Sequence, residues 1–197
     1  MMNTMPNTKY VVLGAVVLLI AWGGRAVEMA QVDPSRTTYG ERNPSAPKEL
    51  AAFSFLIGKW QGTGRARLPD GTVAEFGGVS WIGRYVLDGT AIADELHAAY
   101  PDGRPFLGIS LRHYDASRKA WIVEHLNVSE SFLRKQVNGS SGSVEVDGAD
   151  VRVVTEGSRE HYHVVDQDQW VYRMDLSTDG GRTWNEGQVE MNFRRSE

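Results

Sequence analysis

Short segments of alternating apolar and polar residues fill most of the chain after residue 60. From Trp60 to Leu68 every second residue is apolar or glycine, and the residues between them are polar or charged. This period of two is typical of strands with one buried face. Asp-Gly and Asn-Gly pairs, which favour tight hairpins, recur at residues 70–71, 88–89, 102–103, 138–139 and 147–148.

About ten strands at this spacing, with no helical pattern between them, predict an all-β fold. The even meander favours a closed antiparallel up-and-down β-barrel, because closure leaves no strand edge exposed. Two adjacent glycines, Gly77 and Gly78, predict a bend or bulge in the second strand.

A short helical turn precedes the first strand. Pro47 suits a first-turn position, and Leu50, Phe53 and Leu56 fall at helical spacing before Gly58 ends the turn. We predict that this turn plugs one end of the barrel.

The N-terminal segment has a different character. Lys9 is followed by an unbroken apolar run from Tyr10 to Trp22. Residues 1–26 are therefore either a signal peptide or an uncleaved membrane anchor that contacts the bilayer through residues 10–24 as a separate hydrophobic helix. Both alternatives predict an extracytoplasmic location, periplasmic in a bacterium. Residues 27–46 form an extended linker, and residues 47–197 form the barrel.

The composition of the chain limits the kinds of binding partner and the kinds of reaction that it could support. A length of 197 residues fits one domain, and a net charge of −4 without a basic stripe gives no reason to expect nucleic acid as a partner. The chain has no cysteine, which excludes disulfides, thiolate metal sites and a cysteine nucleophile.

Gly58-Lys59-Trp60, after the helical turn, resembles the Gly-x-Trp opening of lipocalins and their calycin relatives. In those families a late-strand arginine commonly stacks over the tryptophan. The resemblance implies that Arg195, or Arg194 if the register shifts by one, covers Trp60. Residues 50–195 more closely resemble an uncharacterised bacterial domain family of unknown function with a lipocalin-like barrel. The matching segments are residues 55–60, 87–89, 94–95 and 177–184.

The segment Ser177 to Trp184 has the Ser-x-Asp-x-Gly-x-Thr-Trp pattern of an Asp box. We expect Asp179 and Gly181 to close a hairpin and Trp184 to pack beneath it. This motif predicts a turn and carries no activity.

Three sets of side chains could carry chemistry. His161 and His163 share one strand face at a spacing that suits a metal, or they form a hydrogen-bonded polar patch. Haem bound through one barrel histidine, as in nitrobindin-like relatives, is a further alternative, but no residue matches that family's pattern. No cofactor is predicted. Asp94 lies on the face of Ile92 and Leu96, where it is either a catalytic base or, as we favour, the partner of an interior arginine.

The leading function is non-enzymatic binding of a small apolar or aromatic ligand in the barrel. The predicted ligand-binding residues are Leu107, Ile109, Leu111 and Met174 as walls, with His113, His125 and His163 as polar contacts. The first alternative is a membrane-anchored accessory subunit of a larger membrane protein complex. The second is a barrel enzyme of the cyclase or isomerase type that uses Asp94.

Overall fold

The computed structural model describes residues 37–99, 103–128, 135–140 and 143–196. The apolar segment and residues 27–36 of the linker lie outside these ranges, so the signal-peptide and anchor alternatives both stay predictions. No helix within the described residues has the length and apolar character needed to span a bilayer.

One short 3-10 helix, η1 (Lys48–Leu56), precedes eleven strands. The strands are β1 (Gly58–Arg67), β2 (Val73–Val86), β3 (Ala91–Ala99), β4 (Pro105–Asp115), β5 (Ala120–Val128), β6 (Lys135–Ser140), β7 (Ser143–Asp147), β8 (Asp150–Val154), β9 (Ser158–Asp166), β10 (Gln169–Leu176) and β11 (Asn185–Arg195).

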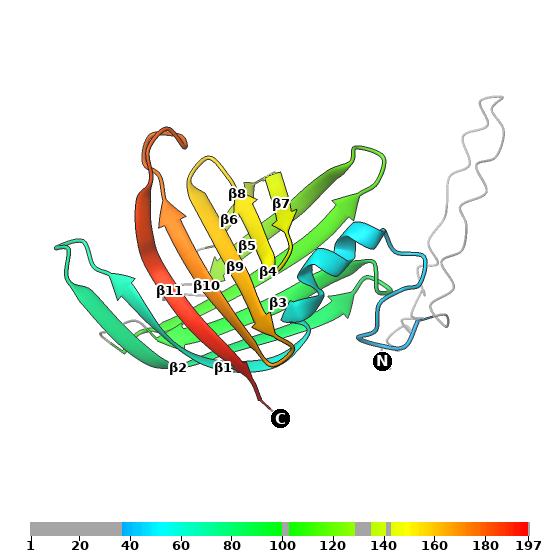
Figure 1. Ribbon diagram of the computed structural model, residues 1–197, viewed down its shortest axis with the longest axis horizontal. Coiled ribbons are helices and arrows are strands. Elements are labelled where there is room, and N and C mark those ends of the chain that lie inside the picture. The colour runs from blue at the N-terminus through cyan, green and yellow to red at the C-terminus, as the bar shows by residue number, and fades with distance from the viewer. Residues whose placement is uncertain (1–36, 100–102, 129–134, 141–142, 197) are drawn as a thin grey trace, which may run out of the picture. The chain divides into compact units, whose positions relative to one another are not determined.

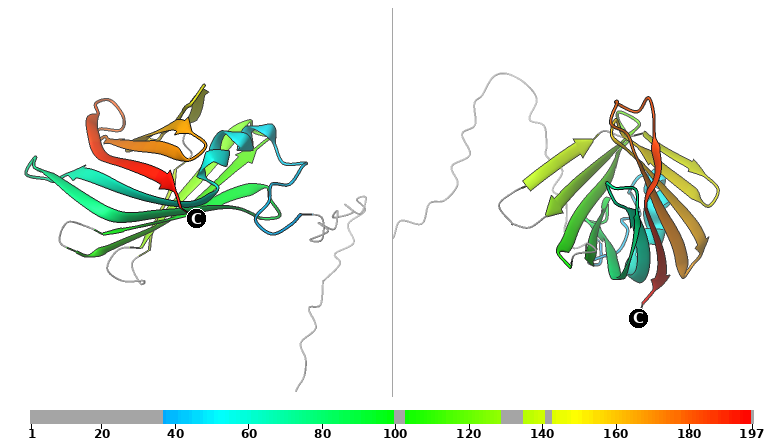
Figure 2. Two further views of the ribbon diagram at one scale, coloured as in Figure 1. Left: turned by 60° about the horizontal axis from the view of Figure 1, so that its bottom comes forward. Right: turned by 90° about the vertical axis from the view of Figure 1, so that its left-hand side faces the viewer.

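All eleven strands belong to one antiparallel sheet in the order β6-β5-β4-β3-β2-β1-β11-β10-β9-β8-β7. The first and last strands therefore pair in the middle of the sheet, and β6 and β7 are its outermost strands (Figures 1 and 2). The strands form a nearly closed barrel, which lacks only a β6–β7 ladder within the described ranges. The predicted all-β, up-and-down barrel is confirmed.

Two local predictions have different outcomes. The register of β1 on β2 shifts between Gly62 and Gly64, opposite Gly77 and Gly78, which confirms the predicted bulge. Asn138-Gly139 was expected to form a turn but lies within β6, where Gly139 pairs with Glu124 of β5. Pairing with β5 satisfies the backbone groups of this segment and outweighs its local turn preference.

The helix η1 packs its apolar side against the barrel interior, as predicted for a plug. Leu50, Phe53 and Leu56 are fully buried. Gly83 of β2 allows the Leu56 main chain to approach closely, since any Cβ at residue 83 would overlap the Leu56 carbonyl. The Trp60 indole N–H donates to that same carbonyl oxygen at 3.1 Å, which ties η1 to β1.

An aromatic cluster fills the barrel beside η1. Trp60 is 1% exposed, and its ring lies 5.9 Å from the Trp170 ring, edge to face. Trp170 in turn stacks on Phe193 at 4.2 Å between centroids. In the β1–β11 ladder Trp60 pairs with Arg195, whose guanidinium carbon lies 4.1 Å from the Trp60 ring centroid. Arg195 also donates to the Ile57 carbonyl, so the last strand covers the first.

The Asp-box segment forms the turn between β10 and β11. Asp179 accepts hydrogen bonds from the backbone N–H groups of Arg182 and Thr183, and Gly181 adopts a positive φ of 82°. The Arg159 guanidinium lies over the Trp184 ring at 4.8 Å.

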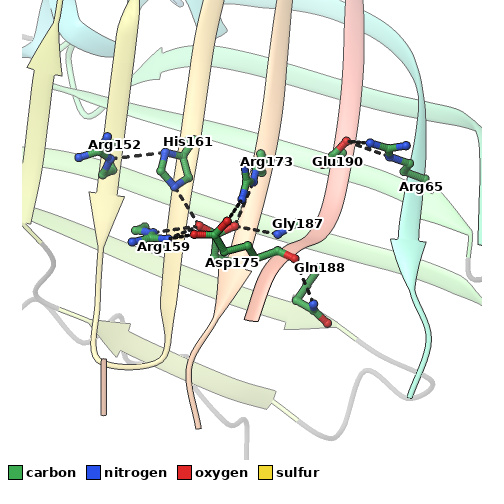
Figure 3. A network of polar contacts seen from close by, with 10 residues as sticks. Arg65, Arg152, Arg159, His161, Arg173, Asp175, Gly187, Gln188 and Glu190 are labelled. Atoms are coloured by element: carbon green, nitrogen blue, oxygen red, sulfur yellow. Dashed lines mark hydrogen bonds and ion pairs between the residues drawn. The ribbon is translucent and has the colours of Figure 1, made fainter. Parts of the chain in front are cut away.

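A polar network lies on the outer face of β8 to β11, centred on Asp175 (Figure 3). The Asp175 carboxylate is completely buried and accepts hydrogen bonds from Arg159, Arg173 and the Gly187 backbone, with His161 at 3.1 Å. Burial alone would raise the pKa of Asp175. The hydrogen bonds from Gly187 and Arg159 and the charge of Arg173 outweigh burial and lower this pKa to about 2.

This lowered pKa predicts an acid-dependent effect of Asp175→Asn. A pKa of about 2, against an ordinary value of 3.8, corresponds to about 2 kcal/mol of stability, present above pH 4 and lost as the pH falls toward 2. Urea unfolding should therefore show the variant about 2 kcal/mol less stable than the wild type at pH 7, and the difference should shrink between about pH 4 and pH 2. Asp150→Asn, which removes an exposed partner of His163, is the control and should cost less than about 0.5 kcal/mol. A pH-independent difference at Asp175 would contradict the assignment.

Candidate functional site

Apolar side chains line part of the barrel interior without being fully buried. Four of these residues are Phe76, Leu96, Met174 and Val189. They face inward because the residues that they pair with on neighbouring strands lie on the same face of the sheet as Trp60 or Trp81. Each of the four side chains is only half-buried. We call these four residues the interior mouth. A hollow of about 570 Å³ beside Phe76 is a different feature, because the outward-facing side chains of Arg65, Glu75 and Glu190 line most of it. The partial exposure of the four mouth residues themselves shows that solvent reaches an apolar inner surface.

A buried ion pair lies next to the interior mouth. Asp94 on β3 is 1% exposed and bonds the guanidinium of Arg112 on β4, which is fully buried. Asp94 is the inward-facing residue that precedes Leu96 of the mouth. The interior arginine predicted as the partner of Asp94 is thus Arg112, and the ion pair leaves this carboxylate poorly placed to act as a free base.

The network continues from Arg112 across the interior to β9. Arg112 Nη2 donates to the Tyr162 hydroxyl at 3.0 Å, and that hydroxyl donates to Glu160 in a short hydrogen bond. Tyr162 is almost completely buried, and burial, together with the charge of Glu160, raises its pKa. The phenol therefore stays protonated and serves as a donor.

The network ends at a histidine that remains partly exposed. His125 Nε2 lies 3.3 Å from Glu160 Oε1, and its Nδ1 lies 2.9 Å from the Ser110 hydroxyl. The His125 side chain is 21% exposed, whereas that of Glu160 is 8% exposed. Met174 of the interior mouth is the cross-strand neighbour of Glu160. The polar chain thus reaches the apolar inner surface at Glu160 and His125.

Several buried polar atoms of this interior have no hydrogen-bond partner among the described residues. They are Asp94 Oδ1, Arg112 Nε, His125 Nε2, Trp81 Nε1 and Trp170 Nε1. An unsatisfied buried donor or acceptor costs about 1–3 kcal/mol. This concentration within one barrel indicates a region where water or a ligand supplies the missing partners.

The structure separates the predicted ligand-binding residues. His125 and Met174 face the interior, as does Asp94, the candidate base. Leu107, Ile109, Leu111 and His113 alternate with the inward-facing Ser110 and Arg112, so they lie on the outer face of β4, where Ile109 is 44% exposed. These four residues therefore do not line the interior. Alternation indicates which residues share a face, but it does not say which face is inside.

His161 and His163 both face outward on β9 but bind separate carboxylates. His161 contacts Asp175, and His163 Nδ1 lies 2.8 Å from Asp150. Within the described ranges no three metal-ligating side chains form a cluster.

Arg112, Tyr162, Glu160 and Ser110 were not singled out as site residues from the sequence. One signal was available for Arg112 and Ser110. A hairpin register that pairs residues 91–99 with residues 105–115 places Ser110 opposite Asp94 and Arg112 opposite Ile92. The contact of this hairpin with Glu160 and Tyr162 depends on closure of the barrel, which no local pattern encodes.

No protein-family model and no curated protein matches this chain, so the resemblance to an uncharacterised bacterial domain family stays a prediction. Solved structures give similarity of fold. The crystal structure of Rv2717c from M. tuberculosis matches with 16% identity and a TM-score of 0.52, over 77% of this chain and 99% of that one. The structure of EF1p2_mFAP2b bound to DFHBI matches with 13% identity and a TM-score of 0.36, over 74% of this chain and 97% of that one. At these identities the first similarity supports a barrel fold alone, and the second carries no argument.

Proposed function

We propose that this barrel binds a small apolar or aromatic ligand in its interior without catalysing a reaction. One observation carries the proposal: a buried polar network with unpaired atoms lies beside an apolar inner surface that is only half-buried. Ligand sites commonly combine apolar walls with a few convergent polar groups. Buried ion pairs such as Asp94–Arg112 are weak evidence for a purely stabilising role.

The neutral fluorescent probe N-phenyl-1-naphthylamine tests this proposal. We expect saturable binding with one site per chain. Met174→Trp should fill the interior mouth and weaken binding at least tenfold. Ile109→Trp, on the outer face of β4, is the matched control and should leave the affinity unchanged. Absence of saturable binding to the wild type, or an equal loss in both variants, would contradict an interior site.

A second candidate function rests on the outer face of β4. The outward row of Leu107, Ile109 and Leu111 includes an exposed isoleucine, which suits docking to another protein better than contact with water. As an accessory subunit of a membrane assembly, the chain would keep one defined partner in native mass spectrometry of a detergent extract. Ile109→Asp should release that partner, and Met174→Trp should not.

A further inference from the structure

The interior network contains more negative than positive charge. Asp94 and Glu160 are both carboxylates, and Arg112 is the guanidinium between them. Arg112 makes a direct ion pair with Asp94 and reaches Glu160 only through the Tyr162 hydroxyl. In the described part of the chain, neither a lysine nor an arginine lies within ion-pair distance of Glu160. Glu160 therefore depends on Tyr162 and His125.

A buried carboxylate without a full counter-charge is costly, because desolvation is not offset by a direct ionic partner. Burial would raise the pKa of Glu160, but the adjacent His125 imidazole, together with the charge of Arg112, outweighs burial and lowers this pKa. Glu160 is thus ionised at neutral pH. A bound cation would supply the positive charge that Glu160 lacks.

The surroundings of Glu160 suit an organic cation rather than a hydrated metal ion. Met174 of the interior mouth is its cross-strand neighbour. Tyr162 and Tyr172 place their rings 5.3 Å apart on the same inner surface, and the Trp81 ring lies 6.1 Å from Tyr172. Aromatic faces attract cations, and the attraction is stronger where water is excluded. An ammonium group with an apolar body would satisfy both the carboxylate and the walls.

We propose that the ligand carries a protonated amine that binds Glu160, while its apolar body lies against Leu96, Met174 and Val189. This inference rests on the proposed function and specifies the chemical class of the ligand. The ammonium N–H groups donate to the Glu160 carboxylate and take the place of the poorly aligned His125 Nε2, which has no hydrogen bond of its own.

Three compounds that share one aromatic body test the sign of the charge: naphthalen-2-ylmethanamine, naphthalen-2-ylmethanol and 2-naphthoate. In calorimetric titrations of the full chain at pH 7.5 we expect the amine to bind at least tenfold more tightly than the alcohol or the acid. Glu160→Gln preserves side-chain shape and should reduce the amine to the affinity of the alcohol. Glu95→Gln, which removes an outer-face carboxylate paired with Arg84, should keep the preference.

The possible outcomes separate the two proposals. Saturable binding of all three compounds with equal affinity, or preference for the acid, overturns the cation inference and leaves the ligand-binding function standing. An amine preference that survives Glu160→Gln also overturns it, since the ammonium then binds elsewhere. If neither the three compounds nor N-phenyl-1-naphthylamine bind, both proposals fail. The comparison of the three compounds on the wild type needs no variant, so it holds even if Glu160→Gln does not fold.

Discussion

Arg112→Ala is expected to lower the free energy of unfolding by about 3–5 kcal/mol, measured by urea denaturation at pH 7. Arg112 is fully buried and bonds both Asp94 and Tyr162. Its removal leaves the Asp94 carboxylate ionised in the interior, or forces it to take up a proton, and leaves a cavity beside Phe53. Both effects act in the same direction.

The double variant Asp94→Asn/Arg112→Met separates charge from volume. It removes both charges and keeps most of the side-chain bulk, so it should lose less stability than Arg112→Ala alone. The difference between the two variants measures the cost of an unpaired carboxylate. A loss below about 1 kcal/mol for Arg112→Ala would show that solvent reaches Asp94 and that the network is not closed to water.

Trp60→Ala is expected to cost about 3–5 kcal/mol of stability, because the indole is 1% exposed and packs against Trp170 beneath η1. The affinity for an interior ligand should stay within about twofold of the wild type, since Trp60 belongs to the plugged end and not to the interior mouth. Thermal unfolding and probe titration on the same sample measure the two quantities.

Arg195→Ala is the companion variant for Trp60. Arg195 is 40% exposed and contributes a cation–π contact with hydrogen bonds at the surface, so its loss should cost only about 0.5–1 kcal/mol. If Trp60→Ala weakens ligand binding as much as Met174→Trp does, the plugged end and the ligand site are not separate.

Local patterns in the sequence predicted the architecture but not the orientation of every strand. Turn pairs and alternation located the strands, and the Gly-x-Trp signal located Trp60 and its arginine. The strand that became β4 has apolar residues on one face and Ser110 and Arg112 on the other, so its pattern favours the outer face as the core. The position of Asp94 on an apolar strand face already indicates that the barrel interior contains charged side chains. Together, these two observations predict that Arg112 faces the interior.

The site itself could be predicted only in part, because its members come from separate regions of the chain. Ser110 and His125 lie on paired strands, but Glu160 and Tyr162 come from β9, which shares no ladder with β4 or β5. Their contact depends on the curvature of the whole sheet. Side-chain periodicity carries no information on contacts made across a barrel.

The central position of β1 and β11 has a consequence for the order of folding. Every other ladder in the described sheet joins strands that are consecutive in sequence, and each such ladder can form as a local hairpin. The β1–β11 ladder joins Trp60 to Arg195 and must close nearly the whole barrel as one loop. Loop closure of this length carries the largest entropic cost and slows pairing. We expect this ladder to form last, so that its loss accelerates unfolding more than it slows folding.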